Sequence, residues 1–270
     1  MKCFLCNKDN FSLEYTLKTK QILRCKNDNI FISQTASKTN KLLYGRTYYQ
    51  EPPYSSNFNM WYFQNKLDEI LKIYRKKNIS ILDVGCGWGD FLEIVKKAKI
   101  PYLGIDTSKE AIGICRSKKL NCKYVDVQTL SRISSQKYTV ITCFQTIEHL
   151  PNPISFLKSV RSLLHKNGII IFTTPNNDSP FRKILGPYWP VYNTDSHFVF
   201  FDSRTLQKTL KKSGFYNIIV DRDSIRLLLL RYIWIRLFSC IPPKILQQIP
   251  IGIITDPFGD LKVVGYKTRL

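Results

Sequence analysis

The sequence contains no long, uninterrupted hydrophobic run. Its first thirteen residues hold two cysteines and several polar side chains, where a secretory signal would have a continuous apolar stretch. The most apolar segment, residues 225–241, is broken by Arg231 and Arg236 and is too short and too charged to span a bilayer. We therefore expect a cytoplasmic protein in which this segment covers an acceptor pocket, makes a homodimer contact or touches a membrane surface peripherally.

Acidic residues are also scarce. The 270-residue chain has 20 Asp and Glu against 41 Lys and Arg, which gives a formal net charge of +21. Such an excess suits nucleic-acid binding, but the basic residues are spread over nearly every expected helix and loop instead of forming one patch. The charge leaves nucleic acid as an alternative partner. It also favours phosphorylated or carboxylated small molecules and anionic membrane surfaces. A lipid-linked acceptor would suit a membrane contact of the 225–241 segment.

Cysteine is present but provides no disulfide framework, because the eight cysteines are scattered through a chain without secretory features. Three of them have metal-ligand spacing: Cys3 and Cys6 form a C-x-x-C pair, and Cys25 follows with Asp28 in place of a fourth cysteine. We call the two turns that contain Cys3–Cys6 and Cys25–Asp28 the knuckles. Short expected strands flank both of them, at 13–17, 21–24 and 30–33. The pattern predicts a zinc-ribbon-like module over residues 1–45, which either binds zinc with Asp28 as a weak fourth ligand or packs without metal.

Glycines cluster in one stretch, Ile-Ser-Ile-Leu-Asp-Val-Gly-Cys-Gly-Trp-Gly-Asp at 79–90. This stretch predicts a buried strand that turns into a helix through Gly85, Gly87 and Gly89, whose backbone can turn sharply and approach a ligand. The G-x-G-x-G spacing, with Asp83 two residues upstream, differs from the G-x-G-x-x-G of dinucleotide sites. A carboxylate there repels phosphate and suits a cationic amino group, which favours S-adenosylmethionine as the cofactor.

Two further carboxylates close the next expected strands. The strand at 101–106 ends in Asp106, about twenty residues after the first glycine, where an acidic side chain can accept both ribose hydroxyls. The strand at 121–127 ends with Asp126, which can accept from an adenine amino group, and Val127, which can pack on the ring. Three acidic residues that close successive strands are a stronger signal than any one of them.

The rest of the chain alternates helices and strands. Apolar periodicity predicts helices at 57–76, 91–98 and 156–164, another helix that stops at Gly214, and strands at 138–144, 169–173, 216–220 and 261–265. This alternation predicts a doubly wound α/β sheet with its ligand crevice at the carboxyl ends of the first and fourth strands. Ahead of the first helix are tyrosines that we expect to pack there or to cover the cofactor: Tyr44, Tyr48, Tyr49 and Tyr54.

These motifs together resemble the class I S-adenosylmethionine-dependent methyltransferases, and more narrowly their ubiquinone-biosynthesis-like group. The residues that carry the resemblance are 82–87, 104–106, 146–153 and 164–176. A looser similarity to methyltransferases of sugar and polysaccharide pathways continues through 195–201 and 206–215, and ribbons precede the methyltransferase domain in some of those relatives. The resemblance implies a Rossmann-like seven-stranded domain over residues 46–270, with an apolar insertion at 222–260 before the last strand.

The resemblance also implies a reaction, the transfer of a methyl group to a small-molecule hydroxyl on a sugar, a polysaccharide precursor or a quinone-like phenol. The segment after the fourth strand places Glu148 and His149 near the methyl group, with His149 as the expected base and His197 as the alternative. The competing interpretation is that Glu148 and His149 cap the helix near Pro151, with His149 in backbone contacts. Gln145, expected beside the cofactor, stands where ubiquinone members have Glu, which argues against a metal held by two carboxylates.

Two other functions stay open at this point. Nucleic-acid methylation is supported only by the charge, because the Asp/Asn-Pro-Pro-aromatic motif of amino-directed base methyltransferases is absent after the fourth strand, where the chain reads Phe-Gln-Thr-Ile at 144–147. The second is a non-catalytic S-adenosylmethionine-binding assembly protein. The missing fourth cysteine and Gln145 allow it, whereas the complete set of expected cofactor residues argues against it.

Overall fold

The structure, a computed structural model, describes residues 1–35, 56–74, 78–223, 227–229, 252–254 and 259–269. The four tyrosines expected over the cofactor and most of the apolar 225–241 segment lie outside these ranges. In the described part of the chain, no helix has both the length and the apolar character needed to cross a bilayer.

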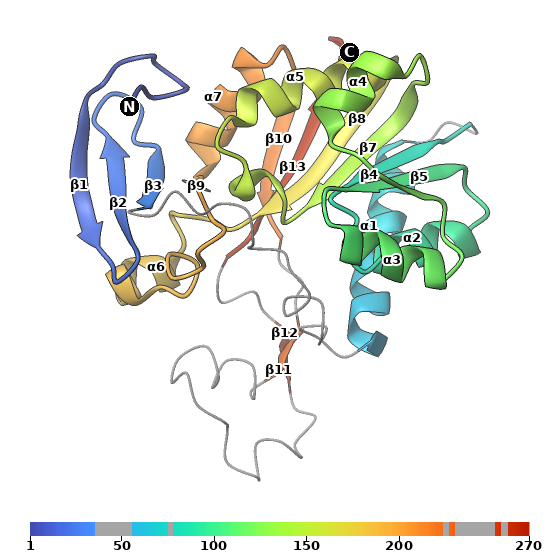
Figure 1. The fold of residues 1–270 in the computed structure, drawn as a ribbon, viewed down its shortest axis with the longest axis horizontal. Coiled ribbons are helices and arrows are strands. Elements are labelled where there is room, and N and C mark those ends of the chain that lie inside the picture. The colour runs from blue at the N-terminus through green and yellow to red at the C-terminus, as the bar shows by residue number, and fades with distance from the viewer. Residues whose placement is uncertain (36–55, 75–77, 224–226, 230–251, 255–258, 270) are drawn as a thin grey trace.

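A central sheet of seven strands organises the structure, in the order β10-β13-β8-β7-β4-β5-β6 (Figure 1). Its strands are β4 (Ile81–Val84), β5 (Tyr102–Asp106), β6 (Cys122–Tyr124), β7 (Tyr138–Phe144), β8 (Leu164–Thr174), β10 (Tyr216–Arg222) and β13 (Leu261–Tyr266). Neighbours from β6 to β8 are parallel, whereas β13 is antiparallel to both β8 and β10. The strand order reverses around β4, so the carboxyl ends of β4 and β7 meet where open α/β sheets bind ligands.

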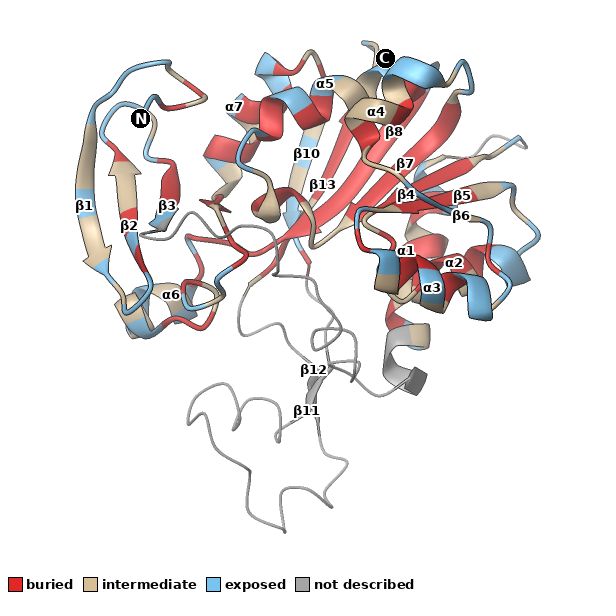
Figure 2. Ribbon diagram, in the orientation of Figure 1, coloured by how far each residue is buried: buried red, intermediate tan, exposed pale blue. Residues whose placement is uncertain are grey.

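Helices cover both faces of this sheet, because successive strand residues point to opposite sides. On one face Ile81 and Val140 pack with apolar residues of α1 (Ser56–Ile73) and α2 (Asp90–Lys97), and α3 (Lys109–Ser117) packs beside α2. On the other face Leu82 and Ile141 share a cluster with α4, α5 and α7. Those helices have the bounds α4 (Val127–Ile133), α5 (Pro153–Leu163) and α7 (Ser203–Lys212). The buried residues lie in the strands and on the inward sides of the helices (Figure 2).

Side chains at the helix starts fix where these helices begin. Ser108, Asp126, Asn152 and Asp202 each accept a hydrogen bond from the backbone N–H three residues later. Such caps satisfy N–H groups that have no partner within the helix and typically contribute about 1 kcal/mol each.

A smaller sheet forms at the N-terminus and includes one strand from far along the chain. Its order is β1-β2-β3-β9, with β1 (Phe11–Thr16), β2 (Lys20–Cys25), β3 (Phe31–Thr35) and β9 (Val199–Phe200). β9 pairs antiparallel with β3 and lies between α6 (Pro180–Leu185) and α7. Residues of β2, β3, β9 and the α6–β9 loop form a cluster of their own, made of Ile22, Phe31, Trp189, Tyr192 and Phe200. The N-terminal segment is therefore built into the rest of the fold through a shared sheet.

The seven-stranded, doubly wound sheet predicted from the sequence is confirmed, and most predicted elements match the observed ones within a few residues. The clearest difference is the strand predicted at 121–127, because β6 ends at Tyr124 and Asp126 already caps α4. The two-residue strand β9 was not predicted, since it forms only by pairing with β3. The predicted apolar insertion contains β11 (Leu227–Leu229) and β12 (Gly252–Ile254), which pair with each other.

Candidate active site

The glycine loop follows β4 and leads into α2. Gly85, Gly87 and Gly89 have φ angles of 76°, 51° and 78°, a left-handed conformation that favours glycine at each position. A Cβ on Gly85 would lie 2.6 Å from Thr146 Oγ1, so the loop contacts the segment that follows β7. A Cβ on Gly87, in contrast, would meet no atom within 4 Å. The backbone at Gly87 therefore lies open to a ligand, and the loop borders the residues expected to carry out the chemistry.

Asp106, at the end of β5, fixes the shape of this loop. Its carboxylate accepts from the backbone N–H of Gly87 at 3.0 Å and from that of Ser108 at 2.8 Å. Burial raises the pKa of this carboxyl group, while the backbone donors partly oppose that rise. A carboxylate has about four acceptor sites, so Asp106 can accept a further hydrogen bond, for example from a ribose hydroxyl.

Asp83 lies deeper, within β4 itself. Its side chain is only 3% exposed and accepts a hydrogen bond from Thr142 Oγ1 at 2.7 Å. Burial raises the pKa of Asp83 to about 7, and the nearby charge of Asp106 adds to the rise. A buried carboxyl group that ionises near neutrality is poised to receive a cationic group, because the cation would stabilise its charged form.

Asp126 and Val127 lie at the start of α4. Both oxygens of Asp126 accept hydrogen bonds from Thr129, one from the backbone N–H and one from the hydroxyl, each at 2.8 Å. Val127 is buried in the core cluster with Leu130. The structure thus gives Asp126 a helix-capping role and Val127 a packing role, and their contact with an adenine stays a prediction.

Gln145 follows β7 with a positive φ of 51°. Its side-chain amide donates to Asp260 Oδ2 at 2.6 Å and to Thr173 Oγ1 at 3.3 Å. Sequence reasoning missed Asp260, although a signal existed. This residue directly precedes β13, and an antiparallel strand begins at the edge where its parallel neighbours end. A buried carboxylate from the far end of the chain therefore stands next to the residue that replaces the family glutamate.

Glu148 and His149 occupy a short 3₁₀ turn, η1 (Ile147–His149), and the structure brings His197 beside them. The two imidazole rings are 4.6 Å apart between centroids, nearly edge to face. Glu148 Oε2 accepts from Thr174 Oγ1 at 2.9 Å. The ligand atoms of all three side chains lie within 4.8 Å of one another, a spacing that also suits one metal ion. The two histidines, alternatives in the sequence, thus belong to one cluster.

The helix-cap interpretation of Glu148 and His149 is wrong. Asn152 caps α5 instead, accepting from the backbone N–H of Ser155 at 3.1 Å. The backbone contact expected in that interpretation is present, because His149 Nδ1 lies 3.0 Å from the carbonyl oxygen of Ser196. Burial lowers the pKa of His149 to about 4, although the backbone carbonyls act against it. His149 is therefore neutral near pH 7.

The N-terminal sheet reaches this cluster through a buried lysine that sequence reasoning also missed. Lys20 is 2% exposed, and its ammonium group donates to the carbonyl oxygens of Thr194 at 2.6 Å and His197 at 3.4 Å. Ser33 donates to the same His197 oxygen at 2.7 Å. Burial lowers the pKa of Lys20 to about 8. No local pattern could reveal these contacts, because they depend on the pairing of β3 with β9.

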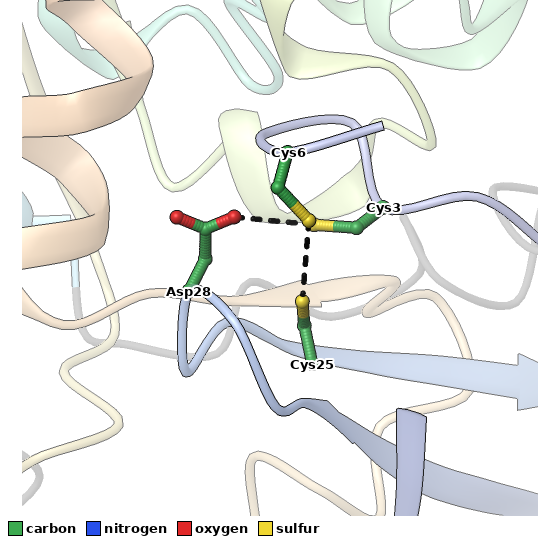
Figure 3. Close-up of side chains that lie close together, drawn as sticks. All are labelled: Cys3, Cys6, Cys25 and Asp28. Carbon is green, nitrogen blue, oxygen red and sulfur yellow. Dashed lines mark hydrogen bonds between the residues drawn. The ribbon is translucent and has the colours of Figure 1, made fainter. Parts of the chain in front are cut away.

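The predicted metal ligands also come together. The ligand atoms of Cys3, Cys6, Cys25 and Asp28 lie within 4.8 Å of one another (Figure 3). This second cluster lies in the N-terminal module and is separate from the glycine loop. The seven cysteines in the described ranges, these three included, form no disulfide.

Curated proteins similar to this chain include two ubiquinone biosynthesis O-methyltransferases. That of Actinobacillus pleuropneumoniae serotype 7 is 34% identical over 107 residues, covering 36% of this chain and 46% of its own length. That of Acinetobacter baylyi is 30% identical over 106 residues, covering 37% and 44%. The chain thus spans about half the length of the curated relatives that it matches.

Solved structures with a similar fold cover more of the chain at lower identity. A SAM-dependent methyltransferase from Archaeoglobus fulgidus has a TM-score of 0.53 at 18% identity, over 75% of this chain and 94% of its own. The plantazolicin methyltransferase BpumL, in complex with a triazolic desmethylPZN analog and SAH, has a TM-score of 0.56 at 21% identity, over 80% and 87%. These similarities show that the sheet and its helices have the Rossmann-like methyltransferase fold.

A family model described as a methyltransferase domain matches residues 59–220, more than half of the chain. The match runs from within α1 into β10 and includes the glycine loop and the Glu148 cluster, whereas β13 of the central sheet lies beyond it. The chain belongs to this methyltransferase domain family.

Proposed function

We propose that this protein is an S-adenosylmethionine-dependent methyltransferase that acts on a hydroxyl group of a small molecule. One observation carries the proposal: the contact between the glycine loop and Thr146. It brings Asp83 and Asp106 on one side, and Glu148 and His149 on the other, to a single edge of the sheet. The chemistry of these groups matches the two halves of a methyl-transfer site.

The glycine loop side suits the cofactor. Gly87 leaves its backbone open, Asp106 has acceptor capacity at the end of β5, and Asp83 offers a carboxylate to a cationic amino group. When bound, S-adenosylmethionine supplies an electrophilic methyl group on its sulfonium. A dinucleotide suits the site less well, because its phosphates would meet the Asp83 carboxylate.

The Glu148 side suits the acceptor. His149 takes the proton from the acceptor hydroxyl in this proposal. It is neutral near pH 7 and is oriented by the carbonyl of Ser196. Glu148, held by Thr174, can stabilise the imidazolium that forms. A conjugate-acid pKa as low as about 4 makes His149 a weak base, so precise placement of the acceptor must supply much of the acceleration.

The acceptor class follows from the relatives and from the charge. The curated relatives are named for ubiquinone biosynthesis, which supports a quinone-like phenol, and the looser similarity noted above supports a sugar hydroxyl. The net charge of +21 favours an acceptor that carries phosphate or carboxylate groups. We place the reaction in a reducing compartment, in keeping with the cysteines described without disulfides.

The test is a methyl-transfer screen with radiolabelled S-adenosylmethionine. The acceptor arms are hydroxylated benzoates and quinols, sugar nucleotides, and unmodified RNA. We expect label in a small-molecule product, with the phenol arm strongest, and the methyl group on oxygen by mass spectrometry. Label found only in RNA would contradict the proposed substrate class. No transfer to any arm, combined with no cofactor binding, would contradict the enzyme assignment.

A pH dependence of cofactor binding follows from Asp83. Because its pKa in the protein is about 7, Asp83 must release a proton before it can pair with a cation at lower pH. The affinity should therefore rise as pH rises from about 5 to 7, by up to tenfold per unit, with proton release measurable by calorimetry in buffers of different ionisation enthalpy. Asp83→Asn should bind more weakly and lose this slope. An equal slope in both proteins would assign the titration to another group.

His149→Ala should lower turnover about a hundredfold or more, because it removes the group that accepts the proton, while the affinity for the cofactor stays almost unchanged. Steady-state kinetics and calorimetry on the same preparations separate the two effects. His165→Ala is the matched control, since His165 is exposed and lies on β8 away from the cluster. If His149→Ala stays within a few-fold of wild type and His197→Ala does not, the base is His197.

A further inference from the structure

The first loop of the N-terminal module folds back on itself as a tight knuckle. The backbone N–H of Cys3 donates to the carbonyl of Lys8 at 3.0 Å, and the N–H of Asn7 donates to the carbonyl of Cys3 at 2.8 Å. Asn7 is left-handed, with a φ of 61°. Cys6 stands three residues after Cys3, just before the left-handed residue. The loop therefore presents both sulfur atoms from one short turn.

The second loop repeats this backbone. The N–H of Cys25 donates to the carbonyl of Ile30 at 2.9 Å, and the N–H of Asn29 donates to the carbonyl of Cys25 at 2.9 Å. Asn29 is left-handed as well, with a φ of 60°. Asp28 stands three residues after Cys25, so it occupies the position that Cys6 has in the first loop. Asp28 thus occupies a metal-ligand position in a loop whose backbone matches that of the first knuckle.

The four side chains converge, with ligand atoms that lie within 4.8 Å of one another (Figure 3). Cys6 Sγ and Cys25 Sγ are 3.7 Å apart, and Cys3 Sγ is 3.9 Å from Asp28 Oδ2. Two sulfurs bound to one zinc at about 2.3 Å in tetrahedral geometry would be about 3.8 Å apart. A disulfide would require about 2.05 Å instead. The separation of the sulfurs matches shared coordination.

Two lysines of α7 face this cluster. Lys208 Nζ lies 2.9 Å from Asp28 Oδ1, the carboxylate oxygen that is not directed at Cys3. Lys212, one turn further along, donates to the carbonyl of Leu5 in the first knuckle at 2.5 Å. Three thiolates and a carboxylate around a divalent ion carry a net charge of −2, which these two ammonium groups can offset. The helix thus supplies the charge that an all-anionic ligand set needs.

We propose that Cys3, Cys6, Cys25 and Asp28 bind one zinc ion, and that Asp28 bridges the ion to Lys208 on α7. Thiolate ligands in tetrahedral geometry select zinc among the common divalent ions. One carboxylate oxygen of Asp28 binds the metal while the other keeps its ion pair. A cysteine at position 28 would have to use one sulfur atom for both contacts, whereas Asp28 has a separate oxygen for each.

The proposed site would connect two parts of the fold. Cys3 and Cys25 belong to the same buried cluster as Leu206 and Leu210 of α7, so the knuckles already pack against that helix. Cys25 is the last residue of β2, and Lys20 is the first. Lys20 donates a hydrogen bond to the carbonyl oxygen of His197. Zinc would therefore stabilise the sheet that supports the Glu148 cluster, without itself touching the reacting groups.

The experiment uses the full chain, purified under reducing conditions, stripped with a chelator and then titrated with zinc alone against a chromophoric competitor. We expect one zinc per chain, and a cobalt-substituted form with the visible absorption of a tetrahedral thiolate centre. Cys6→Ser should lose high-affinity binding. Lys208→Met should weaken it about tenfold, as is typical when a group that orients a ligand is removed. Asp28→Cys should add a fourth thiolate to the cobalt spectrum.

Two matched controls make the outcome decisive. Cys122→Ser alters a half-buried cysteine outside the cluster, and Lys211→Met alters an exposed lysine three residues after Lys208 on α7. Both should bind zinc like wild type. Less than about a tenth of a zinc per chain after metal-replete purification would overturn the site. Equal affinity in Lys208→Met and Lys211→Met would overturn the bridge through Asp28. Neither result depends on methyl transfer.

Discussion

The hydrogen bond from the Gly87 backbone N–H to Asp106 is the interaction on which the candidate site depends. It ties the turn after β4 to the end of β5 and holds the backbone in a left-handed conformation that leaves Gly87 open. The same turn places Gly85 against Thr146, which fixes the distance between the glycine loop and the Glu148 cluster. Cofactor binding and acceptor chemistry are therefore coupled through one short stretch of backbone.

Charge within the site follows from burial. Asp83 and Asp106 are both withdrawn from water, and burial raises the pKa of each, so a cationic ligand gains by restoring their ionised forms. His149 shows the opposite response, because burial lowers the pKa of a base. The candidate site thus combines carboxyl groups that favour a cation with an imidazole kept neutral, an arrangement suited to a sulfonium cofactor and a hydroxyl acceptor.

The central fold could be predicted from the sequence because its signals are local. Glycine spacing fixed the turn after β4, and apolar runs marked the strands on either side of it. Lys20, Asp260 and β9 could not be found in this way. Their partners lie more than a hundred residues away, and only the antiparallel placement of β13 and the pairing of β3 with β9 bring them to the site. His149 and His197 were each predicted as a candidate base, but their contact with each other could be seen only in the folded structure.

Asp126 shows a different limit, because its position near the end of a strand was predicted but its contacts within the fold were not. Its carboxylate was expected at a strand end facing the cofactor, but both oxygens bond to Thr129 and start α4. Aspartate is a preferred residue at helix starts, so a carboxylate at a strand end can cap the following helix as well as face a ligand. The backbone conformation must be known before a binding role can be assigned to a side chain that caps a helix.

The most direct test of the account is calorimetry of S-adenosylmethionine binding to the wild type and to Asp106→Ala. We expect one binding site per chain in the wild type and a loss of about 1.5 to 3 kcal/mol of binding free energy in the variant, the usual cost of removing hydrogen bonds to a charged group. Asp178→Ala, at an exposed aspartate outside the site, should bind like the wild type. Absence of binding in the wild type, or tight binding of a dinucleotide in its place, would contradict it.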